Sequence, residues 1–114
     1  MITINGINPS YIANNLAPSI PIHPGELIKD ELESRGIKQR TLACQMGVSY
    51  SVLNEILNGK RPVTTEYALM FEAALGISAD IWLKTQADYN LQMARRNISF
   101  IERLNGIRRA VAML

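Results

Sequence analysis

A group of hydrogen-bonding side chains lies in the stretch GVSYSVLNEILNGKRPVT, residues 47–64. If residues 50–58 form a helix, its outer face carries Tyr50, Ser51, Asn54, Glu55 and Asn58. Such side chains can exchange hydrogen bonds with a flat polar surface such as the edge of a base pair. Lys60 and Arg61 follow at once and could supply charge to neighbouring phosphates.

The preceding segment must set the direction of that helix. Residues 39–46 fit a short helix with Leu42, Ala43 and Met46 facing inward, and Gly47 ends it. Ser49 is a good N-cap for the next helix, and Val48 is expected to tuck between the two. Two short helices joined by a three- or four-residue turn that contains glycine form a helix-turn-helix unit.

Four further helices are expected, and no run alternates strongly enough to predict a sheet. The first begins at Pro24, turns Leu27, Ile28 and Leu32 inward and ends at Gly36. Another covers residues 65–75 behind Thr64, a longer one follows Ser78, and the last covers about residues 99–113. The fold class is therefore all-α.

The amino-acid composition limits the classes of function that this chain can have. Lysine and arginine number 12 against 10 acidic residues, so the net charge is only +2 and its distribution matters more than its sum. The single cysteine, Cys44, allows no internal disulfide, is expected to pack in the second helix, and fits a cytoplasmic location. We expect no membrane span and no signal peptide. We also find no nucleophile constellation, glycine-rich loop or metal pattern, which predicts no enzyme, no metal and no cofactor.

Over residues 24–94 the sequence resembles antitoxins of the HigA type, within the phage-repressor-like helix-turn-helix group. The resemblance rests on HPGELIKDELE, LNGKRPVT and WLKTQADYNLQMAR occurring in this order. It implies a five-helix phage-repressor-like helix-turn-helix domain with an additional C-terminal helix. It also implies a homodimer that binds palindromic double-stranded operator DNA, represses its own operon and neutralises a RelE-like mRNA-cleaving toxin.

By analogy with phage repressors, site residues can be named. Bases would be contacted from Ser49, Tyr50, Ser51, Asn54 and Glu55. Phosphates would be contacted from Gln39, Arg40, Lys60 and Arg61. The recognition helix departs from the glutamine-rich pattern of the repressors, so the DNA sequence that it reads does not follow. Glu55 could accept a hydrogen bond from a cytosine amino group, but it could also repel phosphates.

Three segments are expected: a weakly ordered arm over residues 1–22, the helix-turn-helix domain over 23–95, and an amphipathic helix over 96–114. The apolar stripe of that last helix could pack on its own domain, on a second copy or on a partner; it comprises Ile98, Ile101, Leu104, Ile107, Val111 and Leu114. A stand-alone repressor-like regulator without a toxin, and a protein-interaction module that no longer binds DNA, are the alternative functions.

Overall fold

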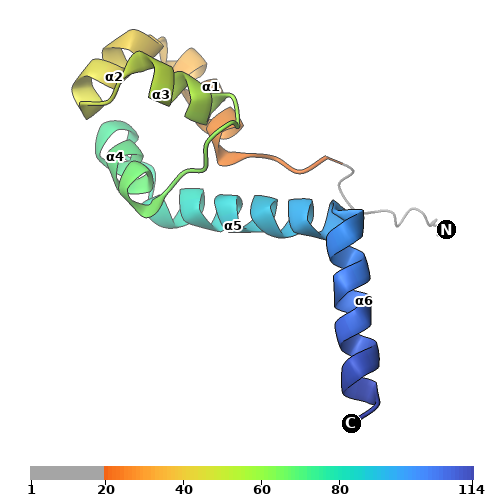
Figure 1. Cartoon of the computed structure of the whole chain (residues 1–114). Helices are drawn as coiled ribbons and strands as arrows, with labels where there is room; N and C mark the ends of the chain where they lie inside the picture. The colour runs from red at the N-terminus through yellow and green to blue at the C-terminus, as the bar shows by residue number, and fades with distance from the viewer. Residues whose placement is uncertain (1–19) are drawn as a thin grey trace, which may run out of the picture.

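A computed structural model describes residues 20–114 of the chain, and these form six α-helices (Figure 1). The helices are α1 (Pro24–Arg35), α2 (Gln39–Met46), α3 (Tyr50–Leu57), α4 (Thr65–Leu75), α5 (Ala79–Arg96) and α6 (Ile98–Ala112). The all-α prediction, with a helix-turn-helix and an additional C-terminal helix, is confirmed. Residues 1–19 of the predicted arm lie outside the described residues.

The helix boundaries follow from local capping. Ser49, Thr64 and Ser78 are the N-caps of α3, α4 and α5, and each side chain accepts a hydrogen bond from a backbone N–H of the first turn. Helix α2 ends at Gly47, whose φ of 71° lies in the left-handed region that favours glycine. Helix α3 ends at Leu57 with Asn58 as its C-cap, slightly earlier than expected.

The start of α1 is built on the sequence His23-Pro24-Gly25. His23 is the N-cap, and its Nδ1 accepts a hydrogen bond of 2.9 Å from the Gly25 N–H. Gly25 lies against the backbone of α3: a Cβ added there would lie 1.9 Å from the carbonyl oxygen of Ile56. Only glycine allows the two helices to approach so closely.

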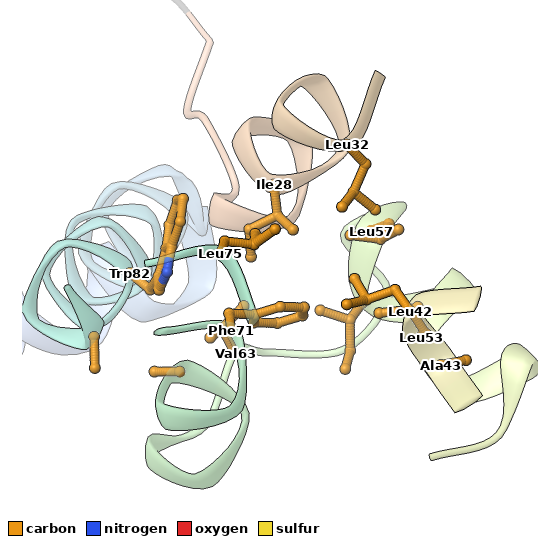
Figure 2. Close-up of a cluster of buried hydrophobic side chains, with 13 residues drawn as sticks. Ile28, Leu32, Leu42, Ala43, Leu53, Leu57, Val63, Phe71, Leu75 and Trp82 are labelled. Carbon is orange, nitrogen blue, oxygen red and sulfur yellow. The ribbon is translucent and has the colours of Figure 1, made fainter. Parts of the chain in front are cut away.

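The core lies where α1 to α5 meet (Figure 2). Ile28, Leu53, Ile56 and Phe71 are fully buried. Trp82 of α5 is 3% exposed and packs in this cluster. Because α3 contributes buried side chains on one side, its opposite face is held in a fixed orientation.

Two expectations about packing were wrong. Leu27 is 39% exposed, because Ile28 and Leu32 define the inward face of α1 and Leu27 points about 100° away from Ile28. Cys44 is exposed, because Leu42 and Ala43 turn the other side of α2 toward the core.

Helix α6 leaves the end of α5 at a steep angle and points away from the other helices (Figure 1). None of its residues is buried, and Ile107 and Val111 are more than half exposed. The possibility that its stripe docks on its own domain is therefore wrong for this arrangement: a helix that extends outward cannot fold its stripe back onto the core. No helix within residues 20–114 is long and apolar enough to cross a membrane.

Candidate nucleic-acid interface

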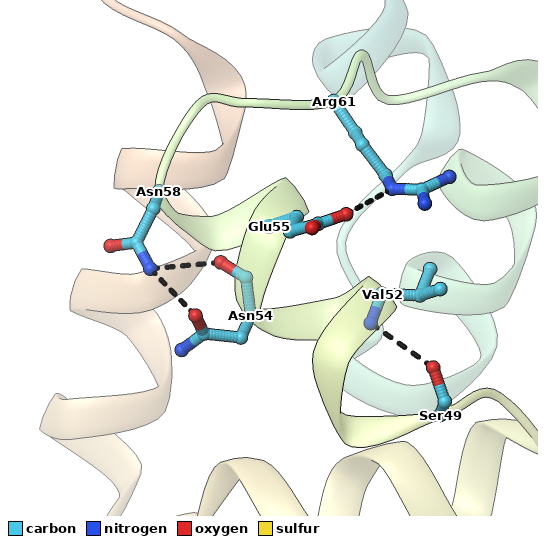
Figure 3. A network of polar contacts seen from close by, with 6 residues as sticks. All are labelled: Ser49, Val52, Asn54, Glu55, Asn58 and Arg61. Atoms are coloured by element: carbon cyan, nitrogen blue, oxygen red, sulfur yellow. Dashed lines mark hydrogen bonds and ion pairs between the residues drawn. The ribbon is translucent and has the colours of Figure 1, made fainter.

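The turn between α2 and α3 is fixed by backbone and side-chain hydrogen bonds. The Val48 N–H donates to the Ala43 carbonyl oxygen at 3.0 Å, and Val48 packs partly buried against the core. Ser49 Oγ accepts from the Val52 N–H at 3.1 Å (Figure 3). The predicted capping role of Ser49 is confirmed, and its hydroxyl lies at the surface where α3 begins.

Tyr50 and Ser51 are exposed in the first turn of α3. The guanidinium of Arg40, from α2, stands 4.4 Å from the centroid of the Tyr50 ring. This distance allows a cation–π attraction, which holds the arginine beside the start of α3. The structure therefore brings together a predicted phosphate contact and a predicted base contact.

A network of amide side chains links α2 and α3. Asn54 Nδ2 donates to Gln39 Oε1 at 3.1 Å, while Asn58 Nδ2 donates to Asn54 Oδ1 at 3.1 Å and to its backbone oxygen at 2.9 Å. Lys29 Nζ of α1 reaches Asn58 Oδ1 at 3.4 Å. Asn54 thus braces two helices, which leaves fewer of its hydrogen bonds for a ligand. The sequence pattern placed Asn58 on the outer face of the helix but did not predict its contacts with Asn54; its spacing of four residues from Asn54 was the available signal.

Glu55 and Arg61 form an ion pair, with Arg61 Nε 2.5 Å from Glu55 Oε1 (Figure 3). The hydrogen bond to the Glu55 carboxylate raises the pKa of Arg61 above its ordinary value. Sequence reasoning gave these residues separate roles, one on bases and one on phosphates. The structure instead joins them, so the negative charge on the outer face of α3 is neutralised within the chain.

The loop after α3 is anchored at both ends. The Lys60 N–H donates to the Glu55 carbonyl oxygen at 2.8 Å, and the Val63 N–H donates to Gln86 Oε1 at 2.7 Å. Gln86 is buried on α5 and donates in turn to Asn90 Oδ1 at 2.9 Å. Sequence reasoning missed Gln86; a polar residue four positions after the buried Trp82, on the same helix face, was the signal.

His23 connects three parts of the molecule: the start of α1, the loop after α3, and α5. Its ring packs edge-on against Tyr89, with ring centroids 4.9 Å apart and an interplanar angle of 77°. Burial lowers its pKa, and this effect exceeds the opposing influences of the Glu26 carboxylate and a hydrogen bond with the Arg61 backbone. The histidine therefore favours its neutral form, in which Nδ1 can accept the capping hydrogen bond.

The first amide groups of α2 are suited to an anion. Its N-cap, Lys38, makes no side-chain capping hydrogen bond. Backbone N–H groups at such an end, together with the helix dipole, attract phosphate. Gln39, the first residue of α2, lies at this end as the sequence predicts.

Comparisons with known proteins agree with this geometry. The helix-turn-helix family model matches residues 28–82. Virulence-associated protein I of Dichelobacter nodosus is 38% identical over 77 residues, which are 67% of this chain and 71% of that protein.

Two solved structures are also similar. One is the Pseudomonas aeruginosa antitoxin HigA with higBA promoter: it is 31% identical with a TM-score of 0.66, and the match covers 74% of this chain and 94% of that one. The other is an addiction module antidote protein of a HigA family from Coxiella burnetii, 32% identical with a TM-score of 0.64, over 73% of this chain and 92% of that one. With a glycine turn, a capped second helix and an exposed polar face on that helix, the chain belongs to the helix-turn-helix family.

Proposed function

We propose that this chain is a cytoplasmic, DNA-binding antitoxin of a type II toxin–antitoxin system. It binds a palindromic operator as a homodimer, represses its own operon and neutralises a RelE-like, mRNA-cleaving toxin. The observation that carries the proposal is the exposed face of α3, which presents hydrogen-bonding side chains with cationic groups on both sides of it. The likeness to an antitoxin solved with its promoter supports the same reading.

In this proposal α3 enters the major groove. Ser49, Tyr50, Ser51, Asn54 and Glu55 face the base edges. Gln39, Arg40, Lys60 and Arg61 lie toward the flanking phosphates. Side chains that read sequence are thus separated along the chain from those that supply affinity. Replacing Tyr50 by alanine is expected to relax discrimination at particular base pairs by about 1–3 kcal/mol; unchanged affinity and preference would show that this docking register is wrong.

The proposed dimer uses the apolar side chains exposed on α5 and α6. Leu91 is 49% exposed and Ile98 is 73% exposed, near the corner where the two helices join. Phe100, Ile107 and Val111 are also exposed and share one face of α6. A second copy could cover this surface. Two recognition helices related by a two-fold axis would then read half-sites about 34 Å apart. Sedimentation at micromolar concentration with and without DNA tests the dimer; a monomer in both cases excludes it.

The decisive experiment is co-expression with the product of the adjacent gene, followed by co-purification and a mobility-shift assay on the shared promoter. Co-purification of a pair that retards the promoter supports the antitoxin proposal. If the chain retards the promoter alone and retains no partner, it acts as a stand-alone repressor. If it retards no promoter fragment, the DNA-binding proposal itself is wrong.

A further inference from the structure

The ion pair between Glu55 and Arg61 lies on the proposed DNA-facing surface. The Glu55 side chain is 44% exposed and that of Arg61 is 49% exposed, so both charges can reach a ligand. A carboxylate on a helix that approaches DNA repels the phosphate backbone. An arginine that is held by a carboxylate is also withheld from phosphates. The pair therefore reduces the attraction of this surface for any DNA, whatever its sequence.

The position of the pair is set by the fold. The loop that carries Arg61 is hydrogen-bonded to the Glu55 backbone through Lys60 and to the buried Gln86 through Val63. With both ends of the loop fixed, the Arg61 backbone is held where its guanidinium can reach the Glu55 carboxylate.

Resting on the proposed DNA-binding function, we propose that the ion pair between Glu55 and Arg61 opens or stays closed according to the base that Glu55 faces. This exchange determines how strongly the chain prefers one DNA sequence over another. Where the base edge opposite Glu55 offers an amino group, as cytosine does, the carboxylate accepts its hydrogen bond and releases Arg61 to a phosphate. Where the base edge offers only hydrogen-bond acceptors, a Glu55 carboxylate separated from Arg61 would face the groove without a hydrogen-bond donor. The pair then stays closed, and the chain lacks one base contact and one phosphate contact.

The experiment compares two duplexes: one selected by the wild-type chain from a random-sequence library, and a scrambled duplex of the same composition. Dissociation constants are measured at several salt concentrations for the wild type, Glu55→Gln, Arg61→Gln and the double variant. Glu33→Gln is the matched control, because it removes the same charge from an exposed position on α1. Thermal unfolding of each variant verifies that it is folded.

We expect Glu55→Gln to bind the scrambled duplex about tenfold more tightly, with a salt slope steeper by about 0.9, as for one added phosphate contact. Its preference for the selected duplex falls by about tenfold or more. Arg61→Gln weakens binding to the selected duplex and lowers its salt slope by about 0.9, because a phosphate contact is lost. On the scrambled duplex it also weakens binding, because it leaves the Glu55 carboxylate unpaired, but the salt slope keeps its value because the closed pair makes no phosphate contact there. In the double variant the gain on scrambled DNA disappears.

The proposal is overturned if Glu55→Gln keeps the wild-type preference, or changes both duplexes equally as a general loss of negative charge would. If Glu55→Gln does not fold, Arg61→Gln decides: an equal loss of salt slope on both duplexes overturns the proposal. A wild-type chain that binds neither duplex at about 100 µM, the weak limit of non-specific binding, instead refutes the proposed function itself.

Discussion

The close approach of α1 to α3 makes Gly25 the most sensitive position for a small substitution. In Gly25→Ala the new Cβ would lie 1.9 Å from the Ile56 carbonyl oxygen, whereas ordinary contact begins at 3.4 Å. The oxygen belongs to the backbone of a buried helix and cannot rotate away. Helix α1 must therefore move outward, and this movement loosens the contacts of Ile28 and Leu32 with the core.

The size of the effect follows from two opposing contributions. Alanine in place of glycine inside a helix normally stabilises by about 0.5–1 kcal/mol. Overpacking costs about 1–3 kcal/mol, and a clash with backbone belongs at the upper end of that range. We therefore expect a net loss of about 2 kcal/mol in the free energy of unfolding. For a domain of this size that corresponds to a fall of about 8–16 °C in the midpoint of thermal unfolding.

Circular dichroism during heating measures this midpoint. Gly106→Ala is the matched control, because a Cβ in α6 would meet only the flexible end of Arg109, at 3.8 Å. That variant is expected to keep or raise the helical signal and the midpoint. If Gly25→Ala unfolds at or above the wild-type temperature, α1 does not lie in tight contact with the backbone of Ile56.

Three further predictions concern other contacts. Burial lowers the pKa of His23 in the folded chain, whereas His23 in the unfolded chain binds a proton near pH 6.5. The free energy of unfolding should therefore be constant above about pH 6.5 and should fall as the pH drops from there toward the lowered pKa. Urea unfolding at about pH 7.5 and about pH 5.5 should show a smaller loss of unfolding free energy for His23→Asn than for the wild type, because asparagine keeps a capping oxygen but cannot ionise. Equal losses in the variant and the wild type would refute the assignment of this pH dependence to His23. Ser49→Ala should lower the free energy of unfolding by about 1 kcal/mol, since it removes the N-cap of α3, and no change in denaturant midpoint would contradict this. Lys60→Ala should weaken binding to all duplexes alike and reduce the salt slope by about 0.9, whereas a sequence-dependent effect would place this side chain on a base.

The sequence by itself determined the helices and the helix-turn-helix. Their boundaries depend on residues close in the chain: Ser49, Thr64 and Ser78 cap their own first turns, and Gly47 ends its own helix. The inward face of α3 also follows from the spacing of apolar residues, because helical periodicity is a local property. The site residues were proposed on the same local basis, and their contacts with DNA stay predictions.

Only the tertiary structure decided which side chains meet. Gly25 carries no sign in the sequence that it lies against the backbone of Ile56 in α3. Nor does the sequence indicate that the buried Gln86 anchors the loop after α3, some 23 positions earlier in the chain. The pairing of Glu55 with Arg61 depends on the path of that loop. These contacts join separate elements, so their geometry is set by how the helices pack, and helical periodicity does not encode it.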